Sequence, residues 1–396
     1  MSIKTHFISP PCYVYLQGLE CLSLPHVQTL NTLYSSFGIE NDFSTYLSQA
    51  TSSFSSLERN VIVQMDEIHV KSDITYKGGK IFAPNLDPED PTRTVFAVMV
   101  SSLHKKWSCI SRLLPCGSIS AEKIFPIIKE CIIDIENCGL RVQIISTGNY
   151  PLSVNLFKLF SMSGKLETRV PHPFDPTRFP FLTFDFVHIL KIIRNNWLNQ
   201  KNFDKTMYFS KILLTLWKTF NVSAPFKGIR LNDNLSTPLI LHDEHFIYLA
   251  RIVYWLDAWQ SLPGKSGKLS KQTYTSLKHA CIALEQITNY LTESCGFSYV
   301  LSAFLQTDPL EHHFGLYRMM VGSNYHISYI QILESERRLK LSNILKMFSD
   351  QQDSCQSIHT FAKSFTSPFS TSSDDQMDLK PYLDGIGDVL SIEYTQ

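Results

Sequence analysis

Residues 60–100, which follow the N-terminal segment, carry the pattern of a β-sheet. Residues 61–71 begin as a largely apolar run, turn polar at Asp66 and Glu67, and then alternate between apolar and polar positions, which predicts a strand. A glycine-containing turn at residues 76–80 predicts a hairpin. Residues 94–100 are apolar on both faces and predict a third, buried strand. Short turns between successive strands favour a meander.

Helical and strand-like patterns then alternate. In residues 121–137 the apolar positions recur on one helical stripe, and Gly139 follows as a stop signal. Residues 141–146 predict another strand, and residues 151–160 predict a second helix. The order strand, strand, strand, helix, strand, helix is typical of an α/β protein with a mixed sheet.

The second half of the chain is mostly helical in pattern. Residues 205–300 read as helices, of which 246–259 and 273–292 are the clearest, and residues 327–347 predict a last helix. Residues 350–374 are rich in Ser and Thr with few aliphatic side chains, which is typical of a loosely structured segment.

Composition restricts the partners and the compartment. The 396 residues include 36 basic and 36 acidic side chains, and this balance argues against a general affinity for nucleic acid, so any basic surface must be local. The nine cysteines form no Cys-x-x-Cys pair, which indicates reduced thiols and no zinc module. No apolar run approaches the ~20 residues that span a membrane. We therefore expect a nuclear or cytoplasmic protein without membrane contact.

Several polar residues are candidates for chemistry. Asp66 stands where a buried strand turns polar, and Asp308 and Glu311 lie three apart at the start of a helix, on one face that suits a divalent cation. Asp185 and His188 belong to a series of polar residues with a three-residue spacing. Each has an ordinary structural alternative: a strand end facing water, a capped helix start, or a local hydrogen-bond set.

Three sequence blocks resemble the catalytic region of P-element-type and THAP-domain transposases. Residues 61–70 resemble the family's first catalytic strand, an apolar run followed by Asp-Glu. Residues 185–195 resemble its Asp-x-x-His-x-x-Lys-x-x-Arg-Asn helix, and residues 306–318 resemble the block with the last catalytic Glu. The blocks occur in the family's order, and the resemblance covers roughly residues 10–345.

The resemblance implies an RNase H-like mixed sheet interrupted by an all-helical insertion domain. It implies a DDE-type polynucleotidyl transferase, which cuts and joins DNA with two Mg²⁺ ions held between acidic residues. By matching, Asp66 is the first acid and Glu311 the last, both as metal ligands, and Asp308 is a nearby acid of the same block. The family also implies DNA as a partner and a homo-oligomer.

The sequence departs from this family at its second acidic position. After the strand at residues 141–146 the family has an Asp, whereas this chain has Gly148, or less plausibly Thr147, at that place. Asn149 offers a neutral oxygen but no charge. The resemblance therefore implies an incomplete two-metal site and impaired catalysis.

Two further departures concern ligands. The Cys and His arrangement of the family's zinc-binding THAP domain does not occur in this sequence. The family's insertion domain binds GTP through an Asp-x-x-Asn pair, and this chain has Asp257 followed by Gln260. The amide at Gln260 in place of Asn argues against guanine selectivity, although GTP stays a possible cofactor.

These observations leave three functional alternatives. The first is a transposase-derived protein, either a decayed copy or a gene reused by its host. The second is an active divalent-metal nuclease in which Asp134 or Asp185 replaces the lost acid, and the third is a non-catalytic interaction module unrelated to transposition. The expected domains are an N-terminal helical remnant (1–58), the first part of the RNase H-like region (59–200), the helical GTP-binding-like insertion (201–300), the C-terminal helix of the RNase H-like region (301–348) and a flexible tail (349–396).

Overall fold

The computed structural model describes residues 6, 9–19, 24–36, 43–71, 75–77, 80–82, 92–198, 206–263 and 268–349. The chain packs into two compact units. The larger comprises Ser53–Ile68 and Asn85–His313, and the smaller comprises Met1–Ser52, His69–Pro84 and Phe314–Gln396. The tail expected to be loose, residues 350–374, lies outside the described residues.

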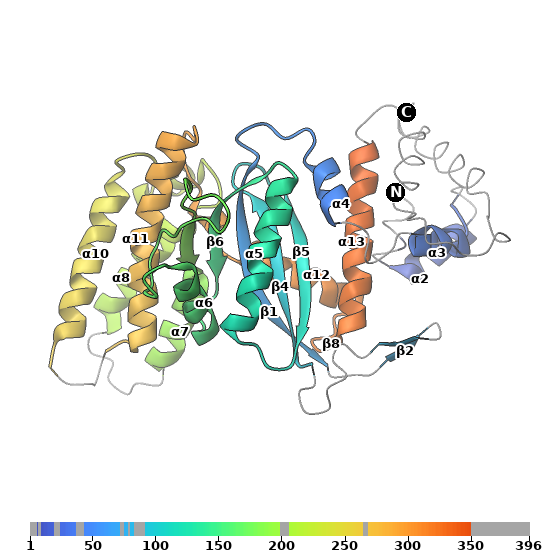
Figure 1. The fold of residues 1–396 in the computed structure, drawn as a ribbon, viewed down its shortest axis with the longest axis horizontal. Helices are drawn as coiled ribbons and strands as arrows, with labels where there is room; N and C mark the ends of the chain where they lie inside the picture. The colour runs from blue at the N-terminus through green and yellow to red at the C-terminus, as the bar shows by residue number, and fades with distance from the viewer. Residues whose placement is uncertain are drawn as a thin grey trace. The chain divides into compact units, whose positions relative to one another are not determined.

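The larger unit is built on a mixed sheet with β1 in its centre (Figure 1). The strand order is β5-β4-β1-β6-β7. β4 and β5 are antiparallel, whereas β6 runs parallel to both of its neighbours, β1 and β7. The mixed sheet predicted from the sequence is therefore confirmed. The strands are β1 (Asn60–Lys71), β4 (Thr94–Ser102), β5 (Ser108–Cys116), β6 (Arg141–Thr147) and β7 (Phe181–Phe184).

Burial explains why these segments form strands. The first seven residues of β1 and all nine of β4 are buried, so both strands consist of continuous apolar runs with few polar positions. Their peptide groups are paired within the sheet, which removes the cost of burying unpaired backbone donors and acceptors.

The helices that follow the strands cover the sheet. Ser120 caps α5 (Ala121–Asn137) by accepting from Lys123 N, and Gly139 ends the turn after it with φ of +80°. Figure 1 shows α5 lying over the sheet, where it packs against β5, β6 and α6 (Pro151–Phe160). The predicted helices 121–137 and 151–160 are confirmed.

β5 is a strand that the sequence pattern missed. It contains Arg112 and Pro115, and most of its side chains are only half-buried. β5 lies at the edge of the sheet in the observed order, where proline is tolerated because one row of backbone donors needs no partner strand. The pattern of a half-exposed edge strand is weaker than that of the central strands, so the sequence analysis did not recognise it.

Helices make up most of the region between β7 and the last helix of the larger unit. α11 packs against α10, β7 and α7, so this region rests on the sheet through α11. The clearest predicted helices, 246–259 and 273–292, lie inside α10 and α11. The elements are α7 (Phe186–Leu198), α8 (Thr206–Phe220), α9 (Lys227–Leu231), α10 (Glu244–Ser261), α11 (Lys271–Ser294) and α12 (Asp308–Met320), with the short 3₁₀ turns Asn234–Ser236 and Ser302–Leu305.

The smaller unit contains the ends of the described chain. β8 pairs in parallel with the end of β1, with Val70 opposite Ile327, and β2 and β3 form the predicted hairpin. The helix predicted at 327–347 begins two residues later, because its first two residues form β8. The elements are α2 (Pro10–Gly18), α3 (Val27–Ser36), α4 (Phe43–Ala50), β2 (Thr75–Lys77), β3 (Lys80–Phe82), β8 (Ile327–Ser328) and α13 (Tyr329–Ser349).

Among the described residues, no helix combines the length and the apolar character that crossing a membrane requires.

Candidate metal centre

The parallel pairing of β1, β6 and β7 stops at one level of the sheet, where β6 and β7 end and β1 continues to Lys71. Met65 of β1 lies opposite Thr147 of β6, which in turn lies opposite Phe184 of β7. In α/β sheets the carboxyl ends of parallel strands are the usual place for ligands. The residues that come next in the three strands are Asp66, Gly148 and Asp185.

A buried polar network fixes the segment before α12 to this edge. Ser146 Oγ donates to Leu305 O at 2.8 Å, and Gln64 donates its side-chain amide to the carbonyl of Gln306. Gln306 Oε1 in turn accepts from Phe186 N at 2.7 Å. These side chains tie the segment to β1, β6 and the start of α7. Glu311, in the first turn of α12, is therefore held near Asp66 of β1.

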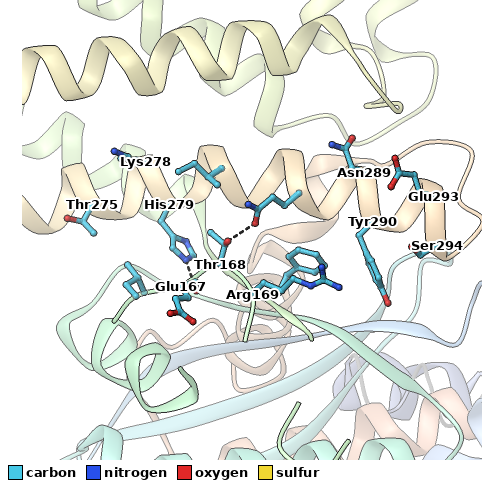
Figure 2. Close-up of a pocket in the computed structure, with 14 residues that line it drawn as sticks. Glu167, Thr168, Arg169, Thr275, Lys278, His279, Asn289, Tyr290, Glu293 and Ser294 are labelled. Carbon is cyan, nitrogen blue, oxygen red and sulfur yellow. Dashed lines mark hydrogen bonds between the residues drawn. The ribbon is translucent and has the colours of Figure 1, made fainter. Parts of the chain in front are cut away.

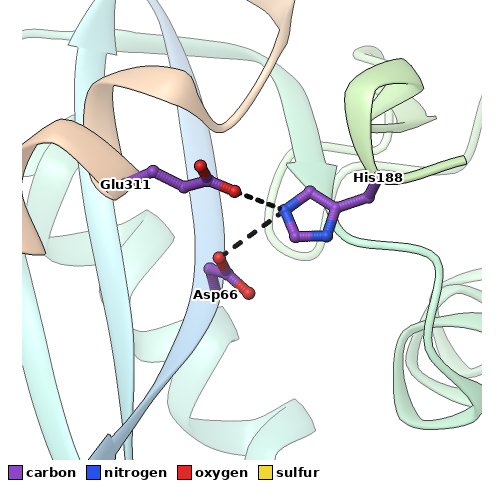
Figure 3. Close-up of side chains that lie close together, drawn as sticks. All are labelled: Asp66, His188 and Glu311. Atoms are coloured by element: carbon purple, nitrogen blue, oxygen red, sulfur yellow. Dashed lines mark ion pairs between the residues drawn. The ribbon is translucent and has the colours of Figure 1, made fainter. Parts of the chain in front are cut away.

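Asp66, His188 and Glu311 converge from three different elements (Figure 3). Each offers one ligand atom, and the three atoms lie within 4.8 Å of one another. His188 Nε2 is 2.9 Å from Glu311 Oε1 and 3.8 Å from Asp66 Oδ2. Lys191 Nζ also contacts Glu311 Oε1, at 2.9 Å. The structure thus brings together the two carboxylates that the sequence analysis paired, and adds a histidine between them.

The two carboxylates differ in electrostatic environment. Burial raises the pKa of Asp66 to about 6, although His188 acts in the opposite direction. The contact with His188 lowers the pKa of Glu311 to about 2 against the effect of burial, and Lys191 adds to the lowering. Burial disfavours the charged form of His188, but the Glu311, Asp185 and Asp66 carboxylates outweigh it and raise its pKa. The centre therefore attracts positive charge.

Asp185 has a structural role at this edge. One carboxylate oxygen accepts from Val187 N at 2.6 Å and His188 N at 3.2 Å, which caps α7. The other accepts from Thr307 N at 2.8 Å and from the Thr307 hydroxyl. A carboxylate has about four acceptor positions, so the bonds of Asp185 leave none for a metal ion.

Asp134, the other candidate for a substitute carboxylate, pairs with Arg112. It lies on α5 and does not belong to the group formed by Asp66, His188 and Glu311. Because Asp134 and Asp185 are both engaged elsewhere, the geometry does not favour the active-nuclease alternative.

Gly148 faces the centre, and a neighbouring ring occupies the space beside it. A Cβ atom at position 148 would lie 3.6 Å from His188 Nδ1, but only 2.6 Å from Cε2 of Tyr150. Gly148 has no positive φ, so its backbone does not itself require glycine. The Tyr150 hydroxyl lies 3.3 Å from His188 Nδ1, and burial, followed by nearby carboxylates, raises the Tyr150 pKa to about 12. A neutral phenol therefore stands where a carboxylate at position 148 would point.

The side chains of Thr147 and Asn149, on either side of Gly148, make hydrogen bonds away from the metal-ligating group. Thr147 Oγ1 bonds to Ser153 Oγ at 3.0 Å. Asn149 Oδ1 accepts from Ser276 Oγ of α11 at 2.7 Å, so its amide oxygen is used to hold the helical region. Of the three turn residues, Gly148 is therefore the one whose Cβ direction faces His188.

The residues present fit one divalent cation. Two carboxylate oxygens and one imidazole nitrogen converge, and His188 Nε2 is buried without a hydrogen bond of good geometry among the described residues. A second ion would require another carboxylate near Gly148, and the side chain that faces this place is the phenol of Tyr150. Asp308 does not supply one, because it is exposed at the start of α12 and lies outside the group.

Asp257 and Gln260 lie together on α10 but make different contacts. Asp257 accepts from Tyr274 at 2.6 Å and from Lys278 at 2.7 Å, both on α11. The side-chain nitrogen of Gln260 approaches Leu269 O at 3.5 Å. Since guanine recognition needs a carboxylate that can accept from the base, the pairing with Lys278 competes with that role.

We expect Asp257→Asn to lower the free energy of unfolding by less than about 1 kcal/mol, because the pair with Lys278 is substantially exposed to solvent. Urea titration followed by fluorescence measures this change. Any shift of the melting temperature that GTP causes should be the same in this variant as in the wild type. A GTP-induced stabilisation that disappears in this variant would instead assign the carboxylate to guanine.

A cavity of about 880 Å³ lies elsewhere in the larger unit, between α11 and residues 166–169 (Figure 2). Thr168 Oγ1 donates to Gln286 Oε1 at 2.6 Å beside it. The Arg169 guanidinium lies over the rings of Phe181 and Tyr290, at 5.3 and 5.4 Å. The residues that line this cavity do not include Asp66, His188 or Glu311. The cavity and the metal-ligating group are therefore separate features.

The sheet, its order and the acidic edge define an RNase H-like fold, followed by a helical region. Residues 35–161 match the family model described as TNP-like, RNase H N-terminal domain. The fold is that of the Drosophila P element transposase in its strand transfer complex, with a TM-score of 0.69 and 16% sequence identity over 86% of this chain and 90% of that chain. None of the curated proteins compared with this chain matches it.

Sequence reasoning missed the residues that shape the centre indirectly. Gln64 and Gln306 are polar residues inside buried segments, and this conflict between polarity and burial is the signal that could have revealed them. Tyr150 had no comparable signal, because its role depends on the direction of its ring.

Proposed function

We propose that this chain is a P-element-like, transposase-derived protein in which the RNase H-like centre no longer supports two-metal DNA cleavage and strand transfer. The observation that carries the proposal is the position of Gly148 at the acidic edge, with the Tyr150 ring in the space that a carboxylate would need. Asp66 and Glu311 are the proposed remnants of the acidic set.

The loss of one carboxylate impairs the chemical step more than it impairs the binding of a cation. In two-metal sites the pair of bound cations stabilises both the attacking and the leaving oxygen of the displacement. Asp66 and Glu311 can hold positive charge, but the carboxylate that would help to bind a second ion is absent from position 148. We infer a protein that retains the architecture and loses the phosphoryl-transfer step.

DNA is the proposed partner. It is supported by the fold shared with a transposase captured in a strand transfer complex. We assign the helices α8 to α11 to the insertion domain expected at 201–300, and we regard GTP as a weak candidate ligand because Asp257 is paired with Lys278.

Restoring the acid tests this proposal. Gly148→Asp alone would bring its side chain against the Tyr150 ring, so the restored variant is Gly148→Asp with Tyr150→Ala. We expect no nicking of supercoiled plasmid by the wild-type protein with Mg²⁺ or Mn²⁺. Nicking should appear in the double variant, because a third carboxylate then completes the acidic set. Plasmid nicking needs no knowledge of a target sequence.

Matched variants separate the carboxylate from the change in space. Tyr150→Ala alone and Gly148→Asn with Tyr150→Ala should both stay inactive, since neither adds a negative charge. Adding Asp66→Asn to the restored variant should abolish its nicking. Wild-type nicking that requires Asp66 would overturn the proposed impairment. An inactive restored variant that binds no additional Mn²⁺ by calorimetry would show that position 148 is wrongly assigned.

A further inference from the structure

The metal-ligating group is mixed in composition, because one of its three ligand atoms is a nitrogen. We infer that Asp66, His188 and Glu311 form a single mixed nitrogen–oxygen site that binds a transition-metal dication such as Co²⁺ or Zn²⁺ in preference to Mg²⁺. This inference rests on the proposed function only for the location of the centre, and it requires neither DNA nor catalysis.

The orientation of His188 supports a role as a ligand. Its Nε2 faces both carboxylates, at 2.9 and 3.8 Å, yet makes no hydrogen bond of good geometry with the described residues (Figure 3). The opposite nitrogen, Nδ1, lies 3.3 Å from the Tyr150 hydroxyl. Metal-binding histidines commonly donate their second ring N–H to a polar partner, which fixes the tautomer. With Nδ1 protonated toward Tyr150, the Nε2 lone pair points between Asp66 and Glu311.

The same contacts explain why the ring cannot easily turn away. His188 stands on the first turn of α7, whose start is fixed by the bonds of Asp185 to Val187 N and His188 N. The Tyr150 ring packs edge-on against the imidazole at 5.8 Å between centroids. A positioned imidazole has less rotamer freedom to lose on binding than a mobile side chain.

Ligand chemistry then selects the metal. Mg²⁺ prefers oxygen ligands in near-octahedral geometry and gives up its water reluctantly. Imidazole favours later first-row metals, whose affinity for nitrogen and oxygen sites exceeds that of the early ones. Three protein ligands with one position left open also match the coordination of reactive zinc sites. Asp66, His188 and Glu311 therefore suit Zn²⁺ or Co²⁺ better than Mg²⁺.

Lys191 provides an internal competitor for the cation. Its ammonium lies 2.9 Å from Glu311 Oε1 and is about half exposed. A bound dication and this ammonium repel each other and share one carboxylate. Removal of the Lys191 charge should therefore tighten metal binding, whereas a purely structural ion pair between Lys191 and Glu311 would give no such gain.

Calorimetry and visible absorption of the full chain with Co²⁺ test the inference. We expect one Co²⁺ per chain, bound at least about tenfold more tightly than Mg²⁺, a difference of about 1.4 kcal/mol. The d–d absorption should indicate nitrogen and oxygen ligands, and sulfur-to-metal charge-transfer bands would expose binding by cysteine instead. His188→Gln should weaken Co²⁺ by at least about tenfold. Lys191→Gln should tighten it by about two- to fivefold.

His312→Gln is the matched control. His312 is exposed on α12 beside Glu311, so its loss should change neither the affinity nor the spectrum. Circular dichroism establishes that each variant is folded. Equal affinities for Mg²⁺ and Co²⁺, an unchanged spectrum in His188→Gln, or no Co²⁺ binding by both the wild type and Lys191→Gln would overturn the inference.

These outcomes are distinguishable from failure of the proposed function. Co²⁺ binding that depends on His188 would stand even if the variant restored at Gly148 never nicks DNA. Conversely, rescued nicking with Mg²⁺ and no Co²⁺ preference in the wild type would remove this inference and leave the proposed function intact.

Discussion

Asp185→Ala should lower the free energy of unfolding of the larger unit by about 3–5 kcal/mol, because it leaves several donors unsatisfied, each at a cost of about 1–3 kcal/mol when buried. Asp185 is fully buried and its carboxylate accepts four hydrogen bonds. Two come from the first turn of α7 and two from Thr307. The substitution leaves all four donors without their acceptor in a buried place, and it removes the cap of α7.

Tryptophan fluorescence during urea titration measures this loss selectively, because all five tryptophans lie in the larger unit. Asp134→Ala is the matched control, since it removes a carboxylate of the same unit whose pair with Arg112 is about one-third exposed. We expect that control to change stability by less than about 1 kcal/mol. Equal losses in the two variants would contradict the structural role given to Asp185.

The second large effect on folding stability is expected when the pH is lowered. His279 on α11 is buried against the rings of Phe157 and Phe184, and its Nε2 lies 3.2 Å from Glu167 O. Burial lowers the His279 pKa to about 4, despite the opposing hydrogen bond to Glu167. The folded protein therefore keeps this histidine neutral at a pH where the unfolded chain protonates it.

The direction in which stability changes with pH follows from the pKa values of His279 in the folded and unfolded states. Above about pH 6.5, the pKa of histidine in the unfolded chain, His279 is neutral in both states and does not lower the free energy of unfolding. As the pH falls, the unfolded chain binds the proton first, so stability is lost, by about 2 kcal/mol at pH 5 and about 3 kcal/mol at pH 4. Below the folded pKa both states are protonated and the loss stops growing.

Comparison with His279→Gln isolates this contribution. Asp66 acts in the opposite direction, because its raised folded pKa favours the folded state as the pH falls. The quantity to measure is therefore the difference in unfolding free energy between wild type and His279→Gln, at pH 7 and pH 5. The wild type should lose about 2 kcal/mol relative to the variant over this interval. A difference that does not change with pH would show that His279 has the same pKa in the folded and unfolded states.

The sequence was informative where burial imposes a regular pattern. β1 and β4 are largely apolar because both of their faces are covered, and the stripe of α5 follows from one buried face. β5 was missed because an edge strand tolerates Arg112 and Pro115. The resemblance implied an RNase H-like mixed sheet, but the strand order came from the structure, since periodicity alone does not say which strands are neighbours.

The candidate site was predictable only in part. Asp66 and Glu311 were singled out by motif, and the structure brings them together. The contacts of His188 could not be derived from a three-residue spacing, because the spacing does not say which side of the helix faces the strand ends. The clash between position 148 and Tyr150 depends on a Cβ direction and a ring rotamer, which no linear pattern encodes.

The fixed segment before α12 has a consequence for how this architecture can change. Ser302 Oγ donates to Thr219 O at 2.6 Å, and the carbonyl of Gln306 is held by Gln64. The chain between Thr219 and Ser302 thus leaves and returns at one hydrogen-bonded point, and within it α11 also packs against β7 and α7. Since closing a longer loop costs little additional entropy, the parts of this stretch outside α11 can lengthen or shorten without displacing Glu311.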